Sequence, residues 1–213
     1  MLFKKSAFLL LLLSFSLTMF GQDVEKEIKL PAPSKDEGFS IMKSLWNRQS
    51  VRECSSKELS LDILGDLVWA ANGINRAEAE KRTAPSAMNK QEIDVYVVTA
   101  AGAYKYQPQE HKLVLVNAGD YRGAVAGRQE AVKSFPVSLV LVADMSKWDN
   151  GEQSLVMAAA DAGYVSQNIC LFCAGRGLST FPRGSMDKAA LKKALKLTDS
   201  QQPLLNNPVG YRK

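Results

Sequence analysis

The chain has 213 residues but a single histidine, His111, which lies in a polar turn. A lone histidine disfavours Ser-His-Asp and Cys-His nucleophilic sites, because both need an imidazole beside the nucleophile. The sequence also has no Gly-x-Ser-x-Gly elbow, no phosphate-binding P-loop and no His-Glu-x-x-His zinc motif. If the protein is an enzyme, these absences favour chemistry carried by an organic cofactor.

Cysteine is also scarce, with three residues in the whole chain. Cys170 and Cys173 lie three positions apart in an apolar segment that is predicted to be helical. A structural zinc site would need two more soft ligands, which the surrounding sequence does not offer. We therefore interpret both cysteines as small apolar core residues and predict no metal site.

The first 21 residues differ in kind from the rest of the chain. Lys4 and Lys5 precede an apolar run over residues 7–20, and the small Gly21 follows. This is the layout of a secretory signal peptide, and the run is short for a membrane span. We expect residues 1–21 to be a signal peptide and the mature protein to be exported, periplasmic or secreted. An uncleaved membrane anchor is the alternative.

The remainder is predicted to be a polar linker, residues 22–38, followed by one domain, residues 39–213. Removing the signal lowers the formal net charge from +5 to +3, because that segment holds Lys4 and Lys5 and no acidic residue. No block of like charges marks a nucleic-acid surface. We expect neither nucleic-acid binding nor stable membrane association after signal cleavage.

Helical and strand patterns are mixed along the domain without strict β-α-β alternation. Ser60 and Gly73 bound a predicted helix as cap and stop, and the apolar run 137–144 is typical of a strand buried on both faces. We therefore expect an α+β sandwich with a mainly antiparallel sheet flanked by helices. Helices are predicted at 39–47, 60–73, 151–178 and 186–197, short helical pieces at 121–135, strands at 93–100 and 137–144, a hairpin at 102–116, a strand end or loop at 179–185 and a short extended segment at 203–213.

Two arginines and a serine stand close together in "WNRQSVRECS", residues 46–55. On one helix face, Arg48 and Arg52 would repel each other unless an anion lay between them. A phosphate monoester has the charge and the acceptor oxygens that two guanidinium groups and the Ser50 hydroxyl can bind. The alternative is a pair of solvated arginines at a helix end.

A second stretch, "RTAPSAMNKQ" at residues 82–91, places Pro85 and Ser86 in a turn and Asn89 just before a strand. A side-chain amide at a loop edge can donate and accept at once, as the imide edge of a heteroaromatic ring requires. The alternative is an ordinary turn asparagine.

The ordered set of such stretches resembles the nitroreductase family of flavoproteins, in particular the subgroup related to SagB-type dehydrogenases. The set comprises the Arg-Ser-Arg opening, "LVWAANGIN", "RTAPSAMNKQ", the "VYVV…GAYKYQPQEHKLV" hairpin, "GDYR", the Asp-x-Gly…Gln-Asn helix that runs into "GLST", and "PVGY". The resemblance covers residues 39–211. It implies a dimeric nitroreductase-like fold with FMN bound at the subunit interface.

The resemblance also implies roles for individual residues. Arg48, Ser50 and Arg52 match the phosphate and ribityl contacts, with Gln49 among them at a position where arginine or histidine is frequent. Asn89 matches the contact to the isoalloxazine edge. The remaining implied FMN contacts are the loop residues Pro85, Ser86 and Ala87, then Arg183 and Gly184 near flavin N5, and the C-terminal Arg212. Arg183 departs from the family, which commonly has an acidic residue before this glycine.

By this resemblance, the protein would be an FMN-dependent oxidoreductase that uses NAD(P)H and passes electrons by a ping-pong route through flavin N5 to a small acceptor such as a nitroaromatic or quinone. Homodimers are typical of the family, and the long apolar helix over 151–178 would suit a subunit interface or a monomer core. Three alternatives remain: a SagB-like dehydrogenase that oxidises its substrate, a non-catalytic flavin-binding protein, and an interaction domain without cofactor. Export would separate the enzyme from the cytosolic NAD(P)H pool.

Overall fold

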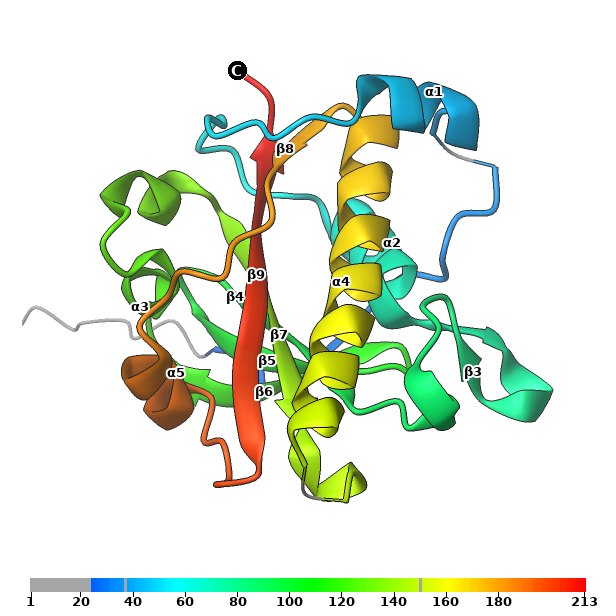
Figure 1. The fold of residues 1–213 in the computed structure, drawn as a ribbon. Coiled ribbons are helices and arrows are strands. Elements are labelled where there is room, and N and C mark those ends of the chain that lie inside the picture. Colours follow the sequence, from blue (N-terminus) through cyan, green and yellow to red (C-terminus); the bar gives the residue numbers. More distant parts are fainter. Residues whose placement is uncertain (1–23, 37, 150) are drawn as a thin grey trace, which may run out of the picture.

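The fold is a seven-stranded antiparallel sheet with helices on both faces, seen in a computed structural model that describes residues 24–36, 38–149 and 151–213 (Figure 1). The predicted signal peptide, residues 1–21, lies outside the described residues. The strand order is β1-β6-β5-β4-β7-β9-β8, and every neighbouring pair is antiparallel. The predicted α+β architecture is therefore confirmed.

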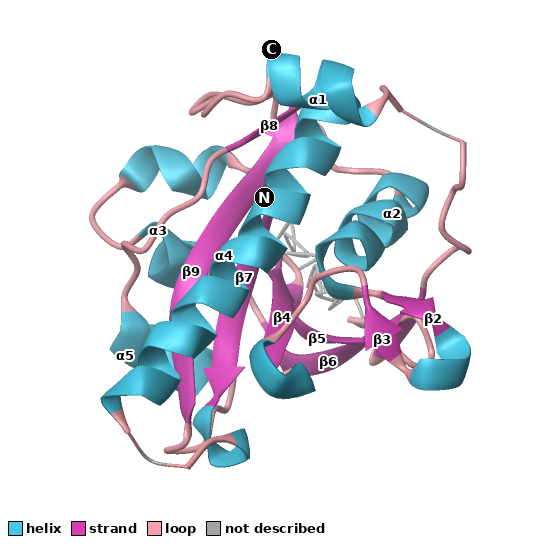
Figure 2. Cartoon of the chain, turned by 45° about the vertical axis from the view of Figure 1, so that its right-hand side comes forward, coloured by secondary structure: helices cyan, strands magenta, loops and turns pink. Residues whose placement is uncertain are grey.

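The sheet has two apolar faces because its central strands alternate their side chains. Val95 and Val97 of β4 join the larger core, whereas Tyr96 and Val98 join the smaller one. Helices α2 and α4 cover the larger core, and α3 and α5 cover the opposite face (Figure 2). The strands are β1 Glu27–Lys29, β4 Ile93–Val98, β5 Gly102–Gln107, β6 Lys112–Ala118, β7 Val137–Asp144, β8 Leu178–Thr180 and β9 Gln201–Tyr211, with a separate pair of β2 Ile74–Arg76 and β3 Lys81–Arg82.

Helix α2 begins and ends at the residues that the sequence marks as cap and stop. Ser60 accepts a hydrogen bond from the Ile63 amide at the start of α2, and Gly73 follows its end. Such a cap contributes about 1 kcal/mol. The helices are α1 Ile41–Asn47, α2 Leu61–Asn72, α3 Arg122–Ala126, α4 Glu152–Gly175 and α5 Lys188–Ala194, together with short 3-10 turns η1 Ala77–Ala79, η2 Ala87–Asn89, η3 Glu130–Ser134 and η4 Met145–Lys147.

Two segments depart from the sequence prediction. Residues 22–38, expected to be a linker, contain β1, which pairs with β6 at the edge of the sheet. The predicted short C-terminal segment is instead the eleven-residue strand β9. Pro203 and Pro208 lie within β9 and conceal it in the sequence. They are tolerated because β8 pairs only with the last three residues of β9, so that most of this strand has one free edge.

Helix α4 is the central helix of the molecule. By length and composition it could cross a membrane. Its contacts identify it as a core helix, because it packs against α1, α2 and the sheet and buries Ala158, Ala162, Val165 and Ile169. Its outward side carries exposed Val156 and Tyr164, so an apolar stripe remains uncovered in the single chain.

Candidate functional site

The segment 48–52 follows α1 and lies along β8. The Val51 amide donates to the Thr180 carbonyl over 3.0 Å, which fixes the segment at the end of the sheet. Arg48, Ser50 and Arg52 are exposed on it. Among the described residues, no carboxylate forms an ion pair with either arginine, so both guanidinium groups are available to an anion.

Arg212 lies in the same region as Arg48, because each arginine is close to one of two neighbouring cysteines on α4. Cys170 and Cys173 lie one turn apart on α4 and are unpaired and buried, as the sequence predicts for core residues. Burial raises the pKa of both thiols, and opposing influences come from the positive charge of Arg48 on Cys170 and of Arg212 on Cys173. The structure therefore brings the predicted arginines from both ends of the domain to the C-terminal half of α4.

The side chain of Arg183 is engaged within the fold. Its guanidinium is only 6% exposed and donates to the carbonyls of Val125 and Ala126 at 3.0 and 2.9 Å. It also donates to Gln129 Oε1 and Asn206 Oδ1, both at 2.9 Å. Val125 and Ala126 end α3, where helix carbonyls lack partners within the helix. The side chain of Arg183 therefore caps α3, and the predicted cofactor contact at Arg183 stays a prediction for its backbone.

The backbone beside Arg183 remains open to a ligand. Gly184 is exposed, and no atom lies within 4 Å of the position that a Cβ would occupy there. Backbone hydrogen bonds between Arg183 and Asn206, 2.8 and 2.7 Å long, hold the preceding residue against β9. A flat ring could therefore approach Gly184 closely without contact to a side chain at that residue.

The second predicted part of the site, residues 85–91, is a strained loop around η2. Met88, Asn89 and Gln91 have φ values of +50°, +53° and +47°. Such left-handed conformations are costly for methionine and glutamine, and they concentrate at functional sites when the surroundings enforce them. The loop is enforced from within by Ser86 Oγ, which accepts from the Gln91 amide at 3.0 Å.

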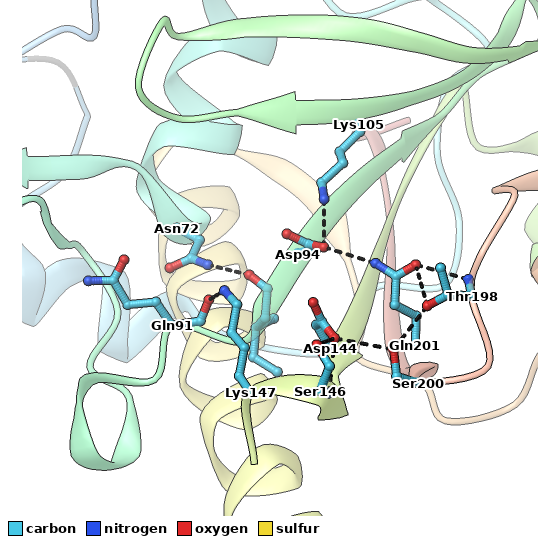
Figure 3. Close-up of polar contacts among 11 residues, drawn as sticks. Asn72, Gln91, Asp94, Lys105, Asp144, Ser146, Lys147, Thr198, Ser200 and Gln201 are labelled. Atoms are coloured by element: carbon cyan, nitrogen blue, oxygen red, sulfur yellow. Dashed lines mark hydrogen bonds and ion pairs between the residues drawn. The ribbon is translucent and has the colours of Figure 1, made fainter.

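Contacts from three other elements hold the same loop. Asp161 of α4 accepts the Ala87 amide at 2.8 Å, and Arg82 of β3 donates to Gln91 Oε1 at 3.0 Å. Lys147 of η4 donates to the Gln91 carbonyl at 2.8 Å (Figure 3). Burial lowers the pKa of Arg82, in accord with its position under the loop. Asn89 is exposed, and its Oδ1 accepts from Gln91 Nε2 at 3.2 Å, which leaves its amide N–H groups toward solvent.

A cavity of about 280 Å³ opens beside this loop. Its lining includes Pro85, Ser86, Asn89 and Gln91, together with Arg76 and Arg82. The lining residues thus combine predicted ring contacts with cationic side chains. Ala87, the other predicted contact, is a half-buried residue of this loop.

The arginine segment and the loop lie on opposite faces of α4. The loop contacts Asp161, whereas Arg48 acts on Cys170, nine residues further along. At 100° and 1.5 Å per residue, this separation is half a turn around the helix and about 13 Å along it. Figure 1 shows β8 and β9 on one side of α4 and β3 on the other. A single copy of the chain therefore does not bring the two predicted parts into one pocket.

Sequence reasoning overlooked Asp161, Arg82 and Glu92 as residues of this region. Asp161 belongs to the Asp-x-Gly pattern, but the sequence gives no sign that its carboxylate binds an amide of a distant loop. Glu92 follows the loop directly and is fully buried, although glutamate is rarely buried without a partner. Among the described residues, no group of three or more His, Cys, Asp or Glu side chains could hold a metal ion.

Comparison with known proteins gives one consistent family. The model of the nitroreductase family matches residues 45–211. A nitroreductase-like protein of Methanocaldococcus jannaschii is 29% identical over 197 residues, which cover 87% of this chain and 96% of that protein. A crystal structure of a nitroreductase-like protein from Ralstonia eutropha is 36% identical, with a TM-score of 0.85 over 90% of this chain and 91% of that chain. One from Anabaena variabilis has 17% identity and a TM-score of 0.73, over 88% of this chain and 42% of that one, and so shows the fold alone.

Proposed function

The chain belongs to the nitroreductase family of oxidoreductases, and we propose that it binds FMN and passes electrons from NAD(P)H to a small organic acceptor such as a nitroaromatic or a quinone. The observation that carries the proposal is the exposed Arg48–Ser50–Arg52 segment, whose two guanidinium groups have no carboxylate partner among the described residues. Two free guanidinium groups suit a phosphate monoester, which carries nearly two charges.

The phosphate end of FMN would be held by Arg48, Ser50 and Arg52, with Arg212 adding a third positive charge and Gln49 lying between them. The segment is already ordered by the Val51–Thr180 hydrogen bond, so that little backbone freedom is lost on binding. Lys213 is less available, because its Nζ lies 3.7 Å from a carboxylate oxygen of Glu53. The donor set fits the phosphate of FMN.

The ring end would be held by the loop 85–89 and by the backbone at Gly184. Asn89 keeps amide donors free for an imide carbonyl, and Pro85, Ser86 and Ala87 shape the loop beside it. When bound, FMN supplies two-electron transfer between a nicotinamide donor and an organic acceptor. The side chains position the ring and exclude water, and solvent can supply the proton, so no residue need act as nucleophile or general acid.

The proposed site needs a second copy of the chain, because its two parts lie on opposite faces of α4. We propose a homodimer in which the arginine segment of one copy meets the loop of the other. The exposed apolar side of α4, with Val156 and Tyr164, and the exposed Trp46 and Met42 of α1 offer the surface for such contact. Obligate dimer interfaces are more apolar than ordinary protein surface.

A complementation experiment tests this arrangement. One variant combines Arg48→Ala with Arg52→Ala, and the other combines Ser86→Pro with Asn89→Ala. Each variant alone should bind FMN too weakly to fill its sites at an FMN concentration that just saturates the wild type. After the two are unfolded together and refolded, shared sites should recover roughly a quarter of the wild-type FMN capacity, since half of the dimers are mixed and each carries one intact site. No recovery would mean that both parts serve FMN within one copy.

The primary experiment is the visible absorption spectrum of the mature chain, residues 22–213, purified without added flavin. We expect a yellow protein that releases about one FMN per subunit on denaturation, as a specific one-to-one site requires. Reduction by NADH or NADPH and reoxidation by a quinone would then establish donor and acceptor. A colourless protein that also fails to bind added FMN would overturn the proposal.

The same preparation separates the alternatives. FMN binding with turnover of an azoline, and no quinone reduction, would favour a SagB-like dehydrogenase that oxidises its substrate. FMN binding without reduction by any nicotinamide would favour a non-catalytic flavin protein. Export from the cell, proposed from residues 1–21, is tested by fractionation. Recovery outside the cytosol would require an electron donor other than the cytosolic NAD(P)H pool.

A further inference from the structure

Glu92 is a fully buried carboxyl group at the end of the strained loop. It follows Gln91 directly and precedes β4, and both of its carboxyl oxygens are inaccessible and accept no hydrogen bond. An ionised carboxylate in such a place would carry a large desolvation cost. The side chain must therefore hold a proton or lie against a group that compensates its charge.

Two other buried polar groups face Glu92. Asp161 of α4 is 3% exposed, and the Trp148 indole Nε1 is buried without a partner. Neither group forms a hydrogen bond of good geometry with Glu92. The Glu92 backbone amide and the Trp148 N–H favour the charged carboxylate, but burial outweighs them. Burial raises the pKa of Glu92, and the nearby negative charge of Asp161 raises that pKa further.

Asp161 is the member of the pair whose carboxyl group has a donor. Its Oδ2 accepts the Ala87 amide over 2.8 Å. Both carboxyl oxygens of Glu92 lack a hydrogen-bond partner. A proton on Glu92 therefore removes the uncompensated buried charge, while the Asp161 side chain holds the first turn of the loop.

The remaining charged groups around the pair lie outside it and are engaged elsewhere. Lys147 donates to the Gln91 carbonyl, and Arg82 donates to Gln91 Oε1. Lys90 Nζ lies 5.6 Å from the centre of the Trp148 ring. From β7, Asp144 donates its amide to the Glu92 carbonyl at 2.9 Å, and its carboxylate accepts from Ser146 at 2.6 Å (Figure 3).

We propose that Glu92 and Asp161 form a buried pair in which Glu92 is protonated, and that this pair positions residues 86–91 for the flavin ring. Glu92 is a positioning residue in this scheme, because it acts through the loop and touches no reacting atom. The inference rests on the proposed function, since the loop matters to catalysis only if it contacts FMN. The pair itself is a property of the folded chain with or without flavin.

The pair makes the loop sensitive to pH. A carboxyl group with a raised pKa in the folded state favours folding most at pH values below its ordinary pKa. That contribution is lost as the pH rises through the raised value. Above it, two like charges occupy the same buried space, and the loop must open to hydrate them. Flavin affinity should therefore fall as the solution becomes alkaline.

The first experiment uses the chain without flavin. 5-Fluorotryptophan is incorporated, and the 19F resonance of Trp148 is assigned with Trp148→Phe. We expect the Trp148 resonance to shift with pH in one step in the wild type, and the step to be absent in Glu92→Gln, which mimics the protonated acid. Absence of the step in the wild type, or an identical step in Glu92→Gln, would overturn the pair.

Asp161→Asn supplies a second test that does not depend on the folding of Glu92→Gln. It removes the neighbouring charge and keeps an oxygen for the Ala87 amide. The step should then move to lower pH, because ionised Glu92 no longer meets a second negative charge. A step that stays at the same pH would contradict the coupling between the two groups.

The second experiment measures FMN affinity against pH in the wild type, in Glu92→Gln and in the exposed control Glu78→Gln. We expect the FMN affinities of the wild type and the control to fall together as the pH rises. The fall should be about tenfold or more for each unit by which the Glu92 pKa differs between the two states of the loop. The FMN affinity of Glu92→Gln should not change with pH. FMN binding with the same pH dependence in Glu92→Gln would overturn the positioning role and leave the proposed function intact. A Trp148 step without any FMN binding would leave the pair intact and overturn the proposed function.

Discussion

Arg52 and Arg183 lie against the same phenyl ring and yet have opposite environments. Their guanidinium carbons are 5.3 and 5.9 Å from the centre of the Phe181 ring. Arg183 is buried and donates to four oxygens, which belong to α3, to the loop that follows α3 and to β9. Arg52 is exposed and has no carboxylate partner among the described residues. A cation that gives four of its five N–H groups to oxygens of the fold stabilises the fold, whereas one with free donors can bind a ligand.

The largest effect on stability is expected for Arg183→Met, which removes the buried guanidinium group. The variant leaves two helix carbonyls and two side-chain oxygens without donors, and unfolding should become easier by about 3 to 5 kcal/mol. Urea unfolding measures the loss. Arg183→Lys should recover part of it, since an ammonium group keeps the charge but lacks the planar fork. A loss under about 1 kcal/mol would show that the acceptors find other donors.

The combined change Arg48→Ala and Arg52→Ala removes the exposed side of the comparison. We expect FMN to bind roughly a hundredfold more weakly, because a hydrogen bond to a charged group contributes about 1.5 to 3 kcal/mol. The unfolding free energy should change by no more than about 0.5 kcal/mol. Isothermal titration with FMN and urea unfolding measure the two quantities. The exposed Arg128→Ala is the matched control and should change neither.

Phe181→Leu tests whether the shared ring links the two arginines. The ring is 6% exposed and packs on Phe135 with centres 5.9 Å apart. Loss of the aromatic contact should lower the unfolding free energy by about 1 to 2 kcal/mol. FMN affinity should fall only severalfold, because Arg52 keeps its charge. An affinity loss as large as that of the double arginine variant would mean that the ring itself positions Arg52.

Salt should have the smallest effect of the four changes, and it should affect the exposed arginines but not the buried Arg183. Raising the ionic strength from about 0.1 M to 1 M shortens the Debye length from about 10 Å to 3 Å. FMN affinity should then weaken by several-fold, because Arg48 and Arg52 are exposed. The difference in unfolding free energy between wild type and Arg183→Met should stay constant, because that guanidinium is buried. A salt-dependent difference would indicate that Arg183 reaches solvent.

Sequence patterns predicted the structure correctly where the stabilising contacts are local. Ser60 and Gly73 bound α2 as predicted, and the apolar run 137–144 is β7, buried over all but its last residue. The hairpin of β5 and β6 also follows from alternation around Pro108. In each case the deciding contacts lie within a few residues of the signal, so a linear pattern contains them.

Other elements depend on partners that are far away in the chain. Strand β1 forms because residues 27–29 meet the free edge of β6, and β9 forms despite two prolines because β7 pairs along it. No local propensity marks residues 27–29 as a strand, and the sequence of residues 203–213 predicts only a short extended segment. The sequence places Arg183 beside an exposed glycine but cannot reveal that four distant oxygens draw its side chain into the interior.

By itself, the sequence determined the fold class and most of the helices and strands, and it predicted a set of candidate site residues. Only the tertiary structure decided how that set is divided. It turned Arg183 into a helix cap, set the arginine segment and the loop 85–91 on opposite faces of α4, and buried Glu92 beside Asp161. The physical reason is that caps and apolar periodicity act between near neighbours, whereas burial and hydrogen-bond satisfaction are settled by residues that only the folded chain brings together.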